Sequence, residues 1–184
     1  EEIKALGGKV FYVPNVKKSP AGFSGAYKKI LQEGNYDAVH VNMLSAANIV
    51  PLKIARECGI PKVICHSHND RAPGFLRNFL HRLFRSSVMK YATDFWACSD
   101  DAARWMFSKA VTENGAYEKI YNAISVEKYA FREEGREKLR KELGIEDCFV
   151  LGHVGRMEPQ KNHKFLLEVF EELAGKDKKA RLLL

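Results

Sequence analysis

The chain has 184 residues, 46% hydrophobic and 29% charged, a globular composition that excludes a disordered or collagen-like chain. No apolar run approaches the roughly 18 residues that a membrane-spanning helix needs, and we expect no secretory signal. The net charge is +7, and residues 1–125 hold 17 Lys and Arg against 11 Asp and Glu. This uneven excess indicates either an anionic partner or ordinary solubility charge.

Residues 1–125 alternate short β-rich runs with amphipathic helical runs. The predicted elements in chain order are strand 9–13, helix 25–33, strand 36–42, helix 46–58, strand 62–68, helix 75–85, strand 94–99, helix 100–109 and strand 119–124. Gly34 and Gly59 are expected to end two of these helices. The alternation predicts an α/β fold, with a Rossmann-like parallel sheet that has helices on both faces.

The character of the sequence changes after residue 125. A highly charged connector helix is predicted first, and it is followed by a strand at 149–155, an amphipathic helix that Gly175 closes and a strand at 180–184. We therefore predict an N-terminal domain over 1–125, an interdomain connector over 126–147 and the beginning of a second Rossmann-like domain over 148–184. Both ends look cut, so we expect an interior piece of a larger protein.

The segment VGRMEPQKN, residues 154–162, joins a predicted strand to a predicted helix. Gly155 permits a close backbone approach, and Arg156 and Lys161 supply two cations beside the free N–H groups of a helix N-terminus. These features predict a cradle for a diphosphate. The alternative is a solvated loop with two surface cations, and the spacing is that of neither a Walker A loop nor a GxGxxG motif.

Two histidines follow a predicted strand in the segment CHSHN, residues 65–69. His66 and His68 are two residues apart and so point to the same side, at the carboxyl end of the strands, where open α/β sheets bind ligands. A histidine there can hydrogen-bond a hydroxyl or phosphate group, or transfer a proton. The alternative is a pair of polar histidines at a loop end. We expect no metal, because only Asp70 is nearby, and we expect His40 to be a satisfied core histidine.

Residues 71–90 hold five Lys and Arg and no acid. The helix predicted at 75–85 has an apolar stripe with aromatic residues, and its basic side carries Arg77, Arg82 and Arg85. Such a helix suits an anionic membrane surface; the alternative is an apolar stripe that packs on the sheet while the basic side faces water. Nucleic acid is not an expected partner, since these residues belong to no nucleic-acid-binding motif.

The remaining reactive side chains form no catalytic pattern. The four cysteines have no CxxC spacing, which argues against a zinc site or redox pair and favours a reducing cytoplasm. No GxSxG or Cys/His signature marks a nucleophile. Ser99 is predicted to cap the helix that follows it.

Five segments occur in the order DAVHVN, GIPKVICHSHN, WACSDDAARWMF, IYNAISVEKYAF and GHVGRMEPQKNHKFLLEVF. Together they resemble the family 4 glycosyltransferases, which have the GT-B architecture of two Rossmann-like domains. That family carries an Arg and a Lys separated by four residues, here Arg156 and Lys161. The HSHN segment is typical of members in capsular and exopolysaccharide biosynthesis, whereas Ala123 departs from the glycine that the family has after Asn122.

The resemblance implies a retaining enzyme that moves a hexose from a nucleotide-diphosphate sugar to a saccharide acceptor, expected to be lipid-linked, in surface polysaccharide synthesis. The donor would lie in the cleft between the domains, where Gly155, Arg156 and Lys161 would bind the diphosphate. His68, ahead of His66, would lie near the transferred sugar. No metal or other cofactor is implied.

The resemblance also implies that the first domain binds the acceptor, with helix 75–85 and its arginines at the membrane face. We expect a cytoplasmic protein that is peripheral at the inner face of the membrane. The family's first glycine-rich loop and its E-x7-E motif lie outside the sequence, so the isolated segment is expected to be inactive. The alternatives are a GT-B sugar-nucleotide epimerase and a non-catalytic module that binds anions or membranes.

Overall fold

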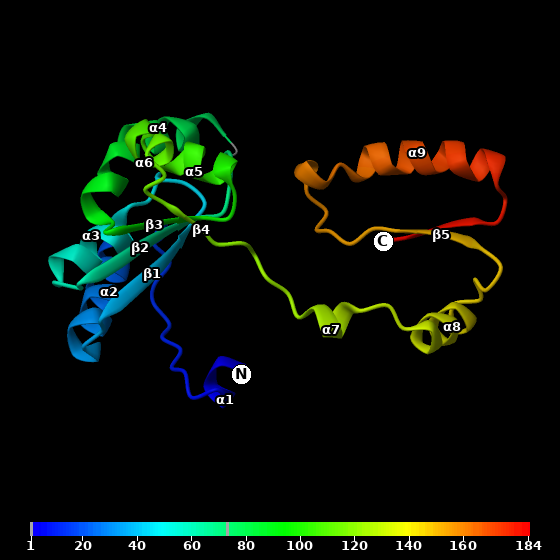
Figure 1. Ribbon diagram of the computed structural model, residues 1–184, viewed down its shortest axis with the longest axis horizontal. Helices are drawn as coiled ribbons and strands as arrows, with labels where there is room; N and C mark the ends of the chain where they lie inside the picture. Colours follow the sequence, from blue (N-terminus) through cyan, green and yellow to red (C-terminus); the bar gives the residue numbers. More distant parts are fainter. Residues whose placement is uncertain (1, 73) are drawn as a thin grey trace. The chain divides into compact units, whose positions relative to one another are not determined.

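The computed structural model describes residues 2–72 and 74–184, and the chain divides into two compact units between Ala123 and Ile124 (Figure 1). The first unit contains a four-stranded sheet in the order β1-β2-β3-β4. Its strands are β1 (Ala38–Met43), β2 (Lys62–Ser67), β3 (Asp94–Ala97) and β4 (Glu118–Lys119). Its helices are α1 (Glu2–Ala5), α2 (Pro20–Gly34), α3 (Val50–Glu57), α4 (Phe75–Tyr91), α5 (Asp100–Met106) and α6 (Lys109–Glu113).

All strand pairs of the first unit are parallel, which confirms the predicted α/β class. In β1 the residues alternate, so that Val39 and Val41 face the interior while His40 and Asn42 are exposed. Helices α3 and α5 pack on the sheet and bury side chains such as Leu52, which has no exposed surface. The polar residues at the carboxyl ends of these strands are therefore held by a well-packed sheet.

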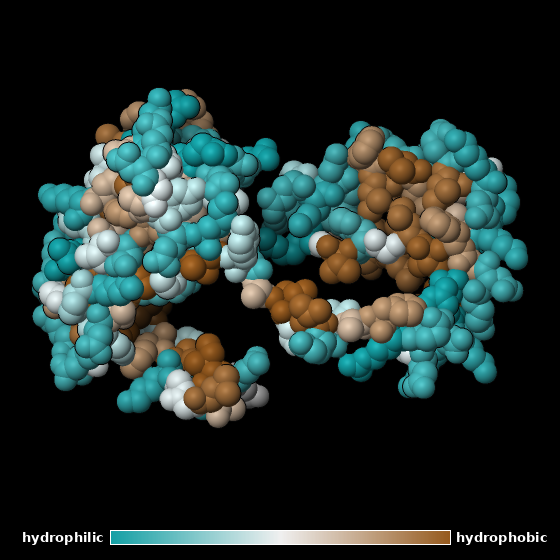
Figure 2. Space-filling view, in the orientation of Figure 1, coloured by the Kyte–Doolittle hydropathy of each residue, from teal (hydrophilic) through white to brown (hydrophobic). Residues whose placement is uncertain are grey.

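The second unit has far less buried surface. It contains α7 (Val126–Tyr129), α8 (Glu133–Glu142), β5 (Phe149–Gly152), the 3-10 turn η1 (Pro159–Lys161), α9 (His163–Lys176) and β6 (Ala180–Leu183). Strands β5 and β6 are parallel, and α9 is the crossover between them. Only Ile145 and Ala180 among its described apolar residues are buried, and Figure 2 shows apolar surface gathered between α9 and β5.

Several predicted elements differ in the structure. The strand predicted at 119–124 is reduced to β4 (Glu118–Lys119), and the helix predicted at 100–109 is divided into α5 and α6. Residues 9–13 form no strand, because they have no ladder partner among the described residues, and Tyr12 is 90% exposed. Helix α2 begins earlier than predicted, at Pro20, and the left-handed residue that follows it is Asn35 rather than Gly34. Helix α9 continues through Gly175.

None of the helices in 2–72 and 74–184 combines the length and the apolar character that crossing a bilayer requires.

Candidate functional site

The two predicted site histidines lie at the carboxyl end of β2. His66 is buried within the strand, with 4% of its surface exposed, whereas His68 comes directly after the strand and is half-buried. Their rings are adjacent, with 4.0 Å between the centroids. Five of the six residues of β2 are buried, so this pair stands on the best-packed strand of the sheet. His68 is the member of the pair that a ligand can reach.

Neighbouring strands supply partners that sequence reasoning missed. The Nε2–H group of His68 donates to Asn42 Oδ1 at 2.7 Å, and His40 Nε2 lies 3.0 Å from His66 Nδ1. The strand register pairs Asn42 with His66, and paired residues of parallel strands point to the same face. His68 lies two residues after His66 on that face, which explains the contact between His68 and Asn42. His40 is exposed, so the expectation of a core histidine is wrong. The Trp96 ring packs edge-on against His40.

Burial lowers the pKa of both His40 and His66, and the nearby His68 lowers each pKa further. Rings this close disfavour a second positive charge in the cluster. The His40 and His66 imidazoles are therefore neutral at pH 7, and one of the two donates its ring proton to the other. The cluster is a set of neutral hydrogen-bonding groups around His68.

The predicted anion loop connects β5 to α9 in the second unit. A Cβ atom at Gly155 would lie 3.0 Å from His153 Nε2 and 3.3 Å from Cγ and Cδ of Lys161. A side chain at position 155 would therefore require small shifts of His153 and Lys161, since the Lys161 side chain runs against the backbone there. The structure brings Gly155 and Lys161 together at the entry to α9, and Asn162 makes the turn into the helix with φ of 46°.

Arg156 is an exposed cation of this loop, and it is paired within the loop. Its Nη1 lies 3.1 Å from Glu158 Oε1, with the Arg156 side chain 79% exposed. The other carboxylate oxygen of Glu158 accepts from Gln160 Nε2 at 2.9 Å. The sequence contains Glu158 inside the predicted cradle, but spacing alone gives no sign that it contacts the arginine.

The three arginines of α4 have different surroundings. The Arg85 guanidinium donates to the carbonyl groups of Arg104, at 2.6 Å, and Phe107, and burial lowers its pKa. Arg85 therefore holds α4 to the end of α5, whereas Arg82 is exposed and Arg77 lines a cavity.

His81 lies one turn before Arg85 and is almost fully buried. The backbone N–H of Ala46 donates to His81 Nδ1 at 3.0 Å, so His81 Nε2–H donates to the carbonyl oxygen of Trp105, also at 3.0 Å. The imidazole stacks on the Trp105 ring, with 3.8 Å between centroids. The polar side of α4 thus packs inward, and the buried imidazole has a lowered pKa, chiefly through desolvation.

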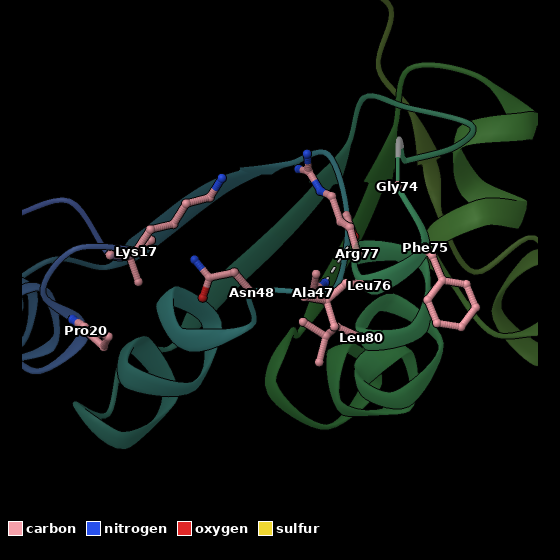
Figure 3. Close-up of a pocket in the computed structure, with 11 residues that line it drawn as sticks. Lys17, Pro20, Ala47, Asn48, Gly74, Phe75, Leu76, Arg77 and Leu80 are labelled. Atoms are coloured by element: carbon pink, nitrogen blue, oxygen red, sulfur yellow. Dashed lines mark hydrogen bonds between the residues drawn. The ribbon is translucent and has the colours of Figure 1, made fainter.

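The apolar stripe of α4 faces outward, so the alternative in which this stripe packs on the sheet is wrong. Phe75 is 88% exposed, and Leu76, Phe79 and Leu83 are each more than half exposed. A cavity of about 810 Å³ lies beside this stripe. Lys17 and Arg77 extend from opposite sides of it, with Asn48 between them (Figure 3).

No group of three or more His, Cys, Asp or Glu side chains is arranged to hold a metal ion in the part of the chain that the structure describes. The four cysteines are free thiols, and burial raises the pKa of the Cys65 thiol to about 12. Cys65 is therefore an unreactive core residue.

Comparisons with known proteins find one curated relative that spans the chain. The chain is 33% identical over 192 residues to the Bacillus subtilis (strain 168) protein named "Putative glycosyltransferase EpsF", and the match covers 100% of the chain and 49% of the relative. The chain therefore spans about half the length of this relative. No model of a protein family matches this chain.

The fold is similar to that of a solved protein, Alr3699/HepE from Anabaena. The complex of that protein with UDP-glucose matches with a TM-score of 0.73, at 19% identity over 99% of this chain and 49% of the other. Its complex with UDP and glucose matches with a TM-score of 0.74, at 19% identity over 98% and 48% of the two chains. These matches confirm the predicted fold.

Proposed function

We propose that this chain is part of a glycosyltransferase that takes a nucleotide-diphosphate sugar as its donor. The observation that carries the proposal is the 33% identity with EpsF along the whole chain, which includes the loop with Gly155, Arg156 and Lys161. The fold shared with HepE, which binds UDP-glucose, supports the same class of donor. A hexose donor and retention of the anomeric configuration are parts of the proposal.

In this mechanism the second unit binds the donor. Arg156 and Lys161 neutralise the diphosphate as the glycosidic bond breaks, and the guanidinium can form two parallel hydrogen bonds to it. Two cations supply this charge, so we propose an enzyme without a metal or other cofactor. His68, held by Asn42 at 2.7 Å, then hydrogen-bonds a hydroxyl group of the transferred sugar, with His66 behind it.

Isothermal calorimetry on the full-length protein tests this proposal. UDP-glucose, UDP-N-acetylglucosamine and GDP-mannose are titrated into the wild type, Arg156→Ala and Lys161→Ala, with Lys164→Ala as a control because it removes an exposed lysine of α9. One donor should bind, and each loop variant should bind it about 10- to 100-fold more weakly. Absence of binding by every donor, or equal binding by the loop variants, would contradict the proposal. Product analysis separates transfer from epimerisation of the donor.

We further propose that the first unit binds an acceptor at an anionic membrane surface. The support is the outward apolar stripe of α4, which lies beside Lys17 and Arg77. Arg82 lies on the same helix, and the segment 71–90 contains no acid. A lipid-linked saccharide fits such a surface, since the apolar side chains can contact its lipid part and the basic side chains can bind its phosphate. The protein would then be cytoplasmic and peripheral at the inner face of the membrane, in surface polysaccharide synthesis.

Vesicle sedimentation tests the membrane contact. The protein should bind vesicles of phosphatidylglycerol but not of phosphatidylcholine, and Phe75→Ser should reduce binding about tenfold, since it removes an exposed aromatic anchor. Phe131→Ser is the matched control, because Phe131 is 73% exposed in the other unit. Equal losses in the two variants would count against α4 as the contact. Vesicle binding without any donor binding would instead favour a non-catalytic membrane module.

A further inference from the structure

The anion loop contains an acid that already contacts its arginine. Glu158 Oε1 lies 3.1 Å from Arg156 Nη1, and Glu158 Oε2 accepts from Gln160 at 2.9 Å. Both oxygens of this carboxylate are therefore engaged inside the loop. In contrast, no carboxylate of residues 2–72 and 74–184 lies within 4.0 Å of the Lys161 ammonium. The two cations of the loop thus differ, one paired and one unpaired.

The backbone of the loop holds the acid in place. The N–H group of Glu158 donates to the carbonyl oxygen of Arg156 at 2.7 Å, and the Lys161 N–H group donates to the carbonyl oxygen of Glu158 at 2.9 Å. These bonds tie Glu158 to both cationic residues by the main chain. The Glu158 side chain is 38% exposed, about half the exposure of Arg156. Its position beside the guanidinium is therefore set by the loop itself.

A carboxylate and a phosphate group accept hydrogen bonds from the same N–H donors of a guanidinium. A phosphate that takes the Arg156 N–H group that faces Glu158 displaces the carboxylate, and the ligand then loses whatever free energy the ion pair contributed. Exposed ion pairs are weak, so the acid can be displaced but still reduces the affinity, by about two- to five-fold. Lys161 imposes no such cost.

We propose that Glu158 is an internal competitor for Arg156 and thereby sets the affinity of the loop for phosphate anions. The inference rests on the proposed function only in that the anion is the diphosphate of a sugar nucleotide. Glu158 lowers the affinity for any ligand whose phosphate contacts Arg156, and it has no effect on a ligand that contacts Lys161 alone. At an unchanged association rate, the nucleoside diphosphate is released faster by the same factor after transfer.

The test is a double-mutant cycle on the full-length protein, with UDP as the probe and calorimetry as the readout at constant salt. Glu158→Gln keeps the shape of the side chain and removes its charge, and it should tighten UDP binding about two- to five-fold. The same substitution in an Arg156→Ala background should have no effect, since the competition needs the guanidinium. Glu168→Gln is the matched control, because it removes one acid of α9 that pairs with Lys164 and not with Arg156.

Several outcomes would overturn the inference. These are weaker UDP binding by Glu158→Gln, equal tightening by Glu168→Gln, and tightening that persists without Arg156. If Lys161→Ala abolishes UDP binding while Glu158→Gln leaves it unchanged, only the role of Glu158 fails. If no variant and no wild-type protein binds UDP, the diphosphate cradle and the role of Glu158 fail together. Glu158→Ala repeats the measurement with a second side chain, and thermal unfolding checks that both variants fold.

Discussion

The two groups of candidate site residues stand on very different supports. His66 and His68 extend from β2, a strand with five of six residues buried and with parallel neighbours on both sides. Arg156 and Lys161 lie on a loop between β5 and α9, two elements that contain no buried residue. The position of the histidines is therefore fixed by packing, whereas that of the cations depends on local ion pairs and turns.

This difference suits the two tasks that we propose. A group that contacts the reacting sugar must be held within a fraction of an ångström, which a packed strand provides. A loop that binds and releases a charged ligand benefits from contacts that are individually weak. The comparison predicts that mutations should affect stability strongly in the first unit and binding strongly in the second.

The largest expected effect is in the core of the first unit. Leu52→Ala empties space around a side chain with no exposed surface, and it should lower the free energy of unfolding by about 3 kcal/mol. Leu166→Ala on α9, where the side chain is only half-buried, should lower it by about 1 kcal/mol. Hydrogen exchange, read separately for each unit, checks both values. Equal losses would break the contrast between the units.

The next effect is the loss of stability at acidic pH that comes from His81. Burial lowers its pKa below the ordinary 6.5, so the unfolded chain takes up the proton first. Its contribution to stability is present above pH 6.5 and is lost as the pH falls below that value, because a proton on Nδ1 displaces the Ala46 N–H group.

The free energy of unfolding of His81→Gln should be about 2 kcal/mol lower than that of the wild type at neutral pH. It should also fall less steeply than that of the wild type between about pH 7.5 and 5.5, the range in which an imidazole titrates. Urea unfolding at several pH values measures this slope. A slope equal to that of the wild type would assign the acid sensitivity to other groups, among which are His40 and His66, whose pKa values burial also lowers.

A smaller effect separates two arginines of the same helix. Arg85→Met should destabilise the first unit by about 1 to 2 kcal/mol, because the carbonyl groups of Arg104 and Phe107 lose their donor. Arg82→Met should change stability by less than about 0.5 kcal/mol, since its side chain is exposed. Thermal unfolding compares the two. In vesicle binding the order should reverse, with Arg82→Met the weaker binder.

The smallest effect compares two serine caps. The Ser99 hydroxyl accepts from the Ala102 N–H group at 3.1 Å at the start of α5, so Ser99→Ala should cost about 1 kcal/mol. Ser125 precedes α7 in the second unit and forms no such bond, so Ser125→Ala should be near neutral. Chemical denaturation resolves the two values. A comparable loss at Ser125 would show that the caps of the two units do not differ.

Sequence patterns predicted the parallel sheet because its strands are apolar runs between helix signals. The strands at 36–42 and 62–68 appear within two residues of their predicted bounds, and Ser99 caps α5 as expected. The strand at 9–13 is absent because a strand needs a partner, which a propensity does not supply. Pattern reasoning thus performed best where burial decides the structure.

The orientation of α4 was beyond such reasoning. Its apolar stripe is the stronger sequence signal, yet His81 and Arg85 face inward, because three carbonyl groups near the end of α5 need donors there. The roles of Asn42 and Glu158 depend in the same way on distances that no motif contains. For the candidate site, the sequence predicted which residue types lie near one another, but it did not predict the contacts of Asn42 with His68 or of Glu158 with Arg156.

Both tryptophans of the chain, Trp96 and Trp105, lie against histidine rings, the second in a parallel stack on His81. A protonated imidazole quenches indole emission far more than a neutral one, so the intrinsic fluorescence should dim as the pH falls. Because both indoles belong to the first unit, this emission reports on the histidine cluster and on the α4–α5 junction. It is an optical signal that the unfolding of the second unit leaves unchanged.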